Sequence, residues 1–143
     1  MPEAKVILFR EPQLTICIEP NNRVIVVQAN GEVPSAMYRE GMELATEQAI
    51  ERRLKYWLVN NKAGGIITPQ DQIWANEVMI PQLAYKSEIV KMALIEPADT
   101  LSQLILEGMM DKARDITPFE MQFFEKLEDA YVWFEEHEDS PGL

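Results

Sequence analysis

The sequence contains one cysteine and one histidine, and neither is accompanied by residues that would make it reactive. Cys17 alone excludes an internal disulfide, and it leaves CxxC redox motifs and cysteine-rich zinc motifs without their other ligands. His137 has no partners for a Ser-His-Asp or Cys-His arrangement or for a multi-histidine metal site. We therefore expect no catalytic residue, no metal ion and no cofactor, and we interpret Cys17 as a structural thiol.

Positive charge is scarce, because 13 Lys and Arg face 24 Asp and Glu and give a net charge of −11. This excess of negative charge disfavours binding to nucleic-acid phosphates and to anionic membrane surfaces. Long apolar runs are also missing. No segment approaches the ~20 apolar residues that cross a bilayer, and the first ten residues lack the apolar run of a signal peptide. We expect a cytoplasmic protein that binds neither nucleic acid nor membranes.

The order of apolar segments indicates the fold class. At 143 residues and 47% hydrophobic, with no repeat or linker, residues 1–143 fit a single domain. Apolar segments at residues 4–10, 14–19 and 23–29 are separated by turn residues, which predicts antiparallel hairpins. From Val24 onward, predicted strands and helices alternate. The chain is therefore predicted to be α/β, a mixed, mainly parallel sheet with N-terminal antiparallel strands and about four helices.

Capping residues and helical spacing predict where the helices begin and which sides they bury. Ser35 is expected to cap the first helix, and Asp99 is expected to cap the helix after the strand at residues 88–96. Apolar residues at helical spacing define the expected inward face of this later helix. That face comprises Leu101, Leu104, Ile105, Gly108 and Met109.

Residues 56–74 contain the best candidate for a functional surface. Residues 56–59 are continuously apolar, as in a central strand covered on both faces. Asn60 and Asn61 are expected to end this strand and, with Gly64 and Gly65, to adopt left-handed backbone conformations in a sharp exit from the sheet. The loops that follow the strands of an open α/β sheet usually form its working surface. Neither GxGxxG nor GxxxxGK[ST] is present there.

A helix start follows the same loop. Ile66 and Ile67 are expected to return to the core, after which Thr68 supplies a hydroxyl N-cap and Asp71 an acid at N3 near the positive helix end. Pro at N1 completes the signal. We predict that a partner binds this edge of the sheet. The predicted contact residues are Asn60, Asn61, Gly64, Gly65, Thr68, Asp71 and Trp74.

The helix predicted at residues 69–85 has an unusually broad apolar surface. Trp74, Val78, Pro81 and Tyr85 recur at helical spacing, and this surplus indicates a deeper core, a dimer contact or a ligand pocket. Pro81 is expected to kink the helix or to end it early. The candidate apolar pocket comprises Trp74, Val78, Met79 and Tyr85.

Three segments suggest a family. The run WLVNNKAGGIITPQDQIWANEVMIP, the strand KMALIEP and the terminal FFEKLEDAYVWF resemble small bacterial stand-alone STAS-like domains. These are related to anti-sigma-factor antagonists and are sometimes grouped with lipid-binding SEC14-type domains. The resemblance covers residues 24–134 and implies the anti-sigma-factor-antagonist type of α/β fold. Its motifs are Trp57, Asn60 or Asn61, Pro69, Asp71, Trp74, Pro81 and the final aromatic helix.

The resemblance also implies a modification site. In signalling members, a Ser or Thr at the start of the helix after the central strand is phosphorylated, and phosphorylation switches partner binding. Thr68 occupies the comparable place, although the Asp-Ser-Ser/Thr-Gly run of those members is absent. Phosphorylation of Thr68 is thus an implication of the resemblance.

These observations predict a non-enzymatic bacterial signalling or regulatory module that binds another protein and forms a homodimer. The alternative is a carrier or sensor of a small apolar, lipid-like ligand, which the broad apolar helix and the SEC14-type kinship suggest. An internal cavity lined by the candidate apolar pocket residues would favour the carrier. A close-packed core would favour the interaction module.

Overall fold

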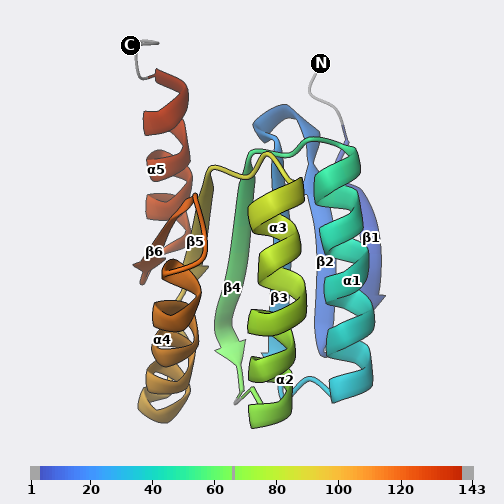
Figure 1. The fold of residues 1–143 in the computed structure, drawn as a ribbon, viewed down its shortest axis with the longest axis vertical. Coiled ribbons are helices and arrows are strands. Elements are labelled where there is room, and N and C mark those ends of the chain that lie inside the picture. The colour runs from blue at the N-terminus through green and yellow to red at the C-terminus, as the bar shows by residue number, and fades with distance from the viewer. Residues whose placement is uncertain (1–3, 66, 140–143) are drawn as a thin grey trace.

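A computed structural model describes residues 4–65 and 67–139, and side chains as far as Glu136. Its six strands form one sheet in the order of the sequence, β1-β2-β3-β4-β5-β6 (Figure 1). The strands are β1 (Val6–Glu11), β2 (Leu14–Glu19), β3 (Val24–Gly31), β4 (Tyr56–Gly64), β5 (Lys91–Ile95) and β6 (Glu120–Phe124). The β1–β2 and β2–β3 pairs are antiparallel, and the β3–β4, β4–β5 and β5–β6 pairs are parallel. The predicted fold class is therefore confirmed.

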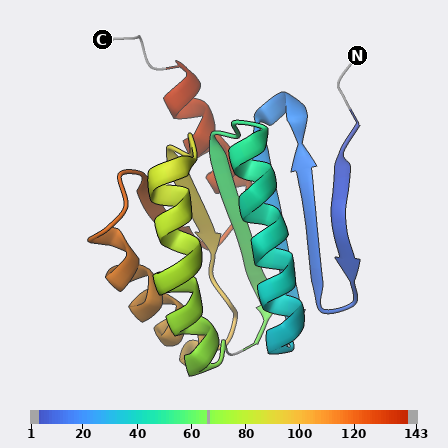
Figure 2. The ribbon, with the colours of Figure 1, turned by 45° about the vertical axis from the view of Figure 1, so that its right-hand side comes forward.

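Helices cover both faces of this sheet. They are η1 (Pro20–Asn22), α1 (Ser35–Glu51), α2 (Pro69–Trp74), η2 (Ala75–Met79), α3 (Ile80–Lys86), α4 (Thr100–Arg114) and α5 (Leu127–Asp139). Crossovers of one hand between parallel strands that advance in one direction place their helices on the same face. Accordingly α1, the α2–η2–α3 helix and α4 share one apolar core with the sheet (Figures 1 and 2), and α5 packs in a second core on the other face.

The central strands are buried on both faces, as the unbroken apolar runs predict. Ile25 of β3 and Trp57 of β4 belong to the core under α1, α3 and α4. Val24, Tyr56 and Leu58 belong to the core under α5. No helix in the described ranges is both long enough and apolar enough to cross a membrane.

Cys17 lies in the interior, on the face of β2 opposite Ile16 and Ile18. Its side chain is buried, and burial raises the pKa of the thiol. Tyr131 of α5 reaches over this strand, since its hydroxyl donates a hydrogen bond to Glu19 Oε1 at 2.6 Å. A buried thiol with a raised pKa is a poor nucleophile, in keeping with the structural interpretation.

The predicted inward face of α4 is correct at Met109 but wrong at its leucine positions, Leu101 and Leu104. Asp99 caps the helix as predicted, because its Oδ2 accepts a hydrogen bond from Ser102 N at 2.8 Å. However, Leu101 is 54% exposed and Leu104 is 62% exposed. The buried side of the helix overlaps the predicted face at Met109 alone. The buried residues of α4 are Ser102, Leu106, Met109, Met110 and Ala113.

The predicted cap of α1 is also wrong. Pro34 occupies the N-cap position and Ser35 is the first helical residue. The Ser35 hydroxyl is engaged elsewhere, because it donates a hydrogen bond to Asp71.

Pro81 does not end the long helix. The preceding residues form the π-helical segment η2, in which Ile80 N donates to Ala75 O, five residues back. A proline inside an α-helix lacks one backbone donor and clashes with the carbonyl four residues earlier. The wider π turn just before Pro81 accommodates both effects, so the helix continues to Lys86.

Close packing of α1 on β2 depends on Gly41. A Cβ atom on Gly41 would lie 2.6 Å from Leu14 Cδ2, whereas a Cβ atom on Gly108 of α4 would meet nothing within 4 Å. We predict that Gly41→Val lowers the free energy of unfolding by about 2 kcal/mol through overpacking. Gly108→Val should change it by less than about 0.5 kcal/mol. Urea denaturation measures both, and equal effects at the two sites would contradict the close α1–β2 contact.

Candidate functional site

The carboxyl edge of the sheet differs from its sequence-based description, because β4 does not end at Asn60 and Asn61. The strand continues to Gly64, paired with β3 through Gln28↔Asn60 and Gly31↔Gly64. The prediction that the asparagines stop the strand is therefore wrong. The asparagines instead coincide with an irregularity inside the strand, because the β3–β4 register shifts between Gln28 and Asn30, and Asn60 Oδ1 accepts a hydrogen bond from Lys62 N at 3.1 Å.

The left-handed conformations predicted for Asn60, Asn61, Gly64 and Gly65 are also wrong. In residues 4–65 and 67–139, positive φ angles occur at Gly31, Arg23 and Arg53 instead. The strand ends at Gly64, one of the four predicted residues, without left-handed backbone there.

Gly64 and Gly65 lie where the end of β4 closely approaches the end of β3. A Cβ atom on Gly64 would lie 3.3 Å from Ala29 Cβ, and one on Gly65 would lie 3.2 Å from Gly31 C. Gly65 N donates a hydrogen bond to Gly31 O at 2.9 Å. Ile66, predicted to enter the core, lies outside the described residues, whereas Ile67 packs half-buried against the main core.

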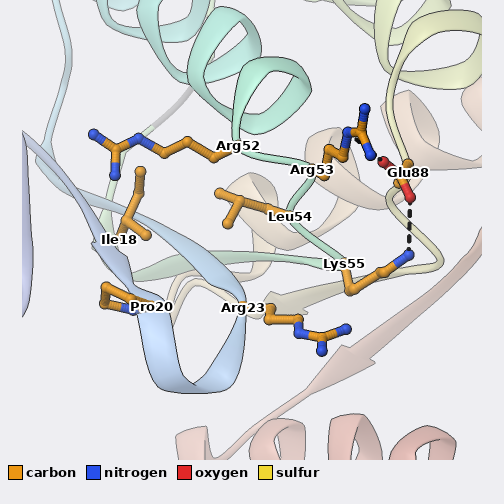
Figure 3. A pocket seen from close by; sticks show the side chains of 8 residues that line it. All are labelled: Ile18, Pro20, Arg23, Arg52, Arg53, Leu54, Lys55 and Glu88. Carbon is orange, nitrogen blue, oxygen red and sulfur yellow. Dashed lines mark hydrogen bonds and ion pairs between the residues drawn. The ribbon is translucent and has the colours of Figure 1, made fainter. Parts of the chain in front are cut away.

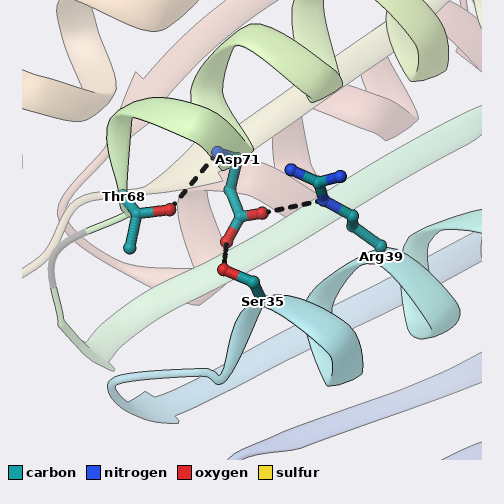
Figure 4. Close-up of polar contacts among 4 residues, drawn as sticks. All are labelled: Ser35, Arg39, Thr68 and Asp71. Carbon is teal, nitrogen blue, oxygen red and sulfur yellow. Dashed lines mark hydrogen bonds and ion pairs between the residues drawn. The ribbon is translucent and has the colours of Figure 1, made fainter.

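The helix start behaves as predicted and also joins two helices. Thr68 is the N-cap of α2, and its Oγ1 accepts a hydrogen bond from Asp71 N at 3.3 Å (Figure 4). Asp71 is 2% exposed. Its Oδ2 accepts a hydrogen bond from Ser35 Oγ at 2.8 Å, and its Oδ1 accepts one from Arg39 Nε at 3.1 Å. Asp71 therefore ties the first turn of α2 to the first turns of α1.

Aromatic side chains extend this connection. The Arg39 guanidinium lies 5.8 Å from the centroid of the Trp74 ring, and Trp74 meets Tyr38 edge to face at a centroid distance of 6.0 Å. Burial, together with the nearby Asp71 carboxylate, raises the pKa of Tyr38, so its phenol stays protonated. Asp71 and half-buried Trp74 thus serve an internal contact, while Thr68 remains exposed at the surface.

The predicted apolar pocket is not assembled. Met79 is 5% exposed and belongs to the core, whereas Tyr85 is 80% exposed on the same helix. Met79 and Tyr85 therefore lie in opposite environments, one in the core and the other at the surface. Trp74 and Met79 instead line a groove of about 160 Å³ with polar neighbours, namely Glu43, Thr46, Glu47 and Gln82.

A larger groove, which the sequence did not predict, lies between α2–η2 and α4. We call it the α2–α4 groove. Its volume is about 480 Å³. Apolar side chains stand on both walls, with Ile73 of α2 57% exposed and Leu104 of α4 62% exposed. The lining residues are Pro69, Gln72, Ile73, Asn76, Glu77, Leu104, Ile105, Gly108, Met109 and Lys112.

Asn76 links the two walls of the α2–α4 groove. Its Nδ2 donates a hydrogen bond to Met109 O at 3.2 Å. Its Oδ1 is buried and has no hydrogen-bond partner among the residues that the structure describes. Buried amide oxygens are usually satisfied, so the contact between η2 and α4 leaves an acceptor open.

Comparison with known proteins identifies the fold. No model of a known protein family matches the chain, and no curated protein is significantly similar to it. Among solved structures, the chain is similar to an uncharacterised protein of the DUF3478 family from Shewanella loihica PV-4, which has a SpoIIAA-like fold. The TM-score is 0.56 at 19% identity, and the match covers 92% of each chain. The chain therefore has a SpoIIAA-like fold, which confirms the STAS-like architecture that the resemblance implied.

The Asp71 connection yields a stability prediction. Asp71→Asn should lower the free energy of unfolding by about 2 kcal/mol, because it weakens the buried bonds to Ser35 and Arg39. The Arg39 side chain is 42% exposed, so solvent screens its ion pair with Asp71 and reduces the contribution of that pair to the free energy of unfolding. A double-mutant cycle with Arg39→Gln should give a coupling energy of about 1 kcal/mol.

The matched control for this cycle is Asp99→Asn, the same change at the start of α4. Asn caps helices as well as Asp does, so this variant should denature at nearly the wild-type urea concentration. If Asp71→Asn were no more damaging than Asp99→Asn, Asp71 would not tie α1 to α2.

Proposed function

We propose that this protein is a non-enzymatic regulatory module, in which the α2–α4 groove binds an amphipathic helix from a partner protein. The proposal rests on two exposed apolar side chains, Ile73 and Leu104, which stand on opposite walls of a groove of about 480 Å³. Apolar side chains on facing helices are normally buried against each other or against a partner.

The chemistry of the groove fits a helical ligand. Ile105 and Met109 add apolar surface, and polar side chains form its margin with Gln72 and Lys112 among them. A partner helix would place apolar anchors at i, i+3 or i+4 and i+7 into such a groove. A net charge of −11 favours a partner that is basic outside these anchors, because opposite charge accelerates encounter.

The groove adjoins the edge that the sequence predicted. Pro69 lines it, and the exposed N-cap Thr68 directly precedes Pro69. A phosphate on Thr68 would gain from the positive end of α2 and would add negative charge at one end of the groove. The STAS-like resemblance supports such a signalling role.

Site-specific photo-crosslinking in cells of the source organism tests the proposal. A photoreactive phenylalanine analogue at Ile73 or Leu104 should capture one and the same protein. At Val132 of α5, which is 53% exposed on the other face of the sheet, it should not capture that protein. Equal capture from all of these positions would contradict docking in the groove.

Binding of the purified partner provides the quantitative test. Leu104→Lys should raise its Kd at least about tenfold, as expected for an apolar anchor, whereas Val132→Lys should leave it within about twofold. Both side chains are exposed, so neither change should alter the free energy of unfolding by more than about 0.5 kcal/mol. An unchanged Kd in Leu104→Lys would contradict the proposal.

Homodimerisation is part of the proposal, and Val78 of η2 and Tyr85 of α3, both exposed, are its proposed contacts. Tyr85→Lys should shift sedimentation velocity toward the monomer, whereas Val132→Lys should not. If the wild-type protein sediments as a monomer at high concentration, the homodimer is excluded and the partner-binding proposal stands alone.

A further inference from the structure

A pocket of about 510 Å³ lies at the opposite edge of the sheet, where the parallel strands begin (Figure 3). It is formed by the turn before β3, the turn after α1 and the segment before β5. Its lining residues are Ile18, Pro20, Arg23, Arg52, Arg53, Leu54, Lys55 and Glu88.

The pocket concentrates positive charge in an acidic protein. Of the 13 Lys and Arg in the chain, four line it, and Glu88 is the acid that lines it with them. Glu88 pairs with Arg53 at 3.5 Å and with Lys55 at 3.1 Å. Figure 3 shows Arg23, Arg53, Lys55 and Glu88 on one side of the pocket, with Arg52 directed away from them. Arg23, Arg53 and Lys55 together exceed Glu88 by two positive charges.

Two of these arginines have an unfavourable backbone conformation. Arg23 has φ 55° and Arg53 has φ 54°, and they are the non-glycine residues with positive φ in the described part of the chain. The left-handed region costs a side-chain-bearing residue about 1–2 kcal/mol relative to the right-handed one, so glycine or asparagine is usual there. The two turns are bonded together, because Arg23 O accepts hydrogen bonds from Lys55 N at 3.0 Å and Tyr56 N at 3.2 Å.

Complementing the helix dipole does not account for this arrangement. Arg52 and Arg53 follow the last turn of α1, where positive charge interacts favourably with the negative helix end. Arg23 belongs to a different turn, after η1, and yet directs its charge to the same pocket. Both left-handed residues end helices, because Arg23 N donates to Pro20 O after η1 and Leu54 N donates to Ala49 O after α1. Glycine is the usual residue at such positions, so the presence of arginine at both of them places a guanidinium at the pocket at a cost in backbone energy.

We propose that this pocket binds a small phosphate-bearing ligand, with Arg23 and Arg53 donating hydrogen bonds to phosphate oxygens and Lys55 adding charge. The planar guanidinium matches phosphate geometry, which makes arginine the preferred residue for this task. The pocket, at about 510 Å³, is larger than a phosphate ion, so it leaves room for an organic substituent. The phosphate would come from a soluble ester or diphosphate, because the net charge of −11 opposes binding at anionic membranes. This site is independent of the α2–α4 groove.

Titration with pyrophosphate, followed by two-dimensional 15N NMR at constant ionic strength, tests the proposal. Saturable shifts should be confined to the residues that line the pocket. Arg23→Gln should raise the Kd at least about tenfold, as expected for a lost charge-assisted hydrogen bond. Arg10→Gln, the same charge change at an exposed site on β1, should leave the Kd within about twofold. Shifts that do not saturate, or equal weakening by both variants, would overturn the proposal.

Glycine variants separate function from folding. Arg23→Gly and Arg53→Gly relieve the left-handed strain, so each should raise the urea midpoint while raising the Kd for pyrophosphate. A variant that lowers the midpoint and leaves the Kd unchanged would show that the arginine is structural and would overturn its assignment.

Vesicles of phosphatidylcholine with phosphatidic acid distinguish the source of the phosphate. Pyrophosphate binding without vesicle binding supports a soluble ligand. If the protein binds vesicles but not pyrophosphate, and Arg23→Gln abolishes vesicle binding, the ligand would be a lipid headgroup and not a soluble phosphate. Binding to neither would overturn the proposal.

Discussion

The arrangement of this protein depends on one topological constraint, that its strands pair in the order of the sequence. Parallel strands that advance in one direction through crossovers of one hand place α1, the α2–η2–α3 helix and α4 on the same face. The other face then has α5 as its cover. How closely the three neighbouring helices approach one another decides which surfaces are internal and which remain open.

The two gaps between these helices differ in chemistry. Between α1 and α2, the buried Asp71 carboxylate accepts hydrogen bonds from Ser35 and Arg39, and the Trp74 ring packs beside them. Between η2 and α4, Asn76 makes a hydrogen bond to Met109 O but leaves its Oδ1 unsatisfied, and apolar side chains stand exposed on both walls. The contacts in the first gap therefore join α1 to α2. The second gap is the one that we propose as the binding surface.

The basic pocket adds a separate site at the other edge of the sheet. Its charges come from turns at residues 20–23 and 52–55, which the parallel pairing of β3 and β4 brings side by side. One small domain thus presents an apolar groove near the carboxyl ends of its parallel strands and a cationic pocket near their amino ends.

Signals in the sequence predicted the fold class and two of the three helix caps, whereas Ser35 was wrongly assigned as a cap. The alternation of segments predicted the topology, and the caps Thr68 and Asp99 are where hydroxyl and carboxylate preferences place them. The extent of β4 was mispredicted because its continuation depends on pairing with β3, which no local preference encodes.

The α4 face was mispredicted because the helix is apolar on more than one side. Tertiary packing buried the side that carries Leu106, Met110 and Ala113, and helical spacing alone does not distinguish that side from the predicted one. The α2–α4 groove was missed for the same reason, since its wall residue Leu104 was assigned to the core. The cationic pocket was missed because arginine is not a turn signal, so nothing local marked Arg23 or Arg53 as left-handed.

Hydrogen exchange of the protein with and without its purified partner would test the central claim most directly. If a partner helix occupies the α2–α4 groove, amide protection should rise in residues 69–79 and 100–112 and stay unchanged in residues 127–136. Protection that rises over α5 or over β1, with none over α2 and α4, would contradict it.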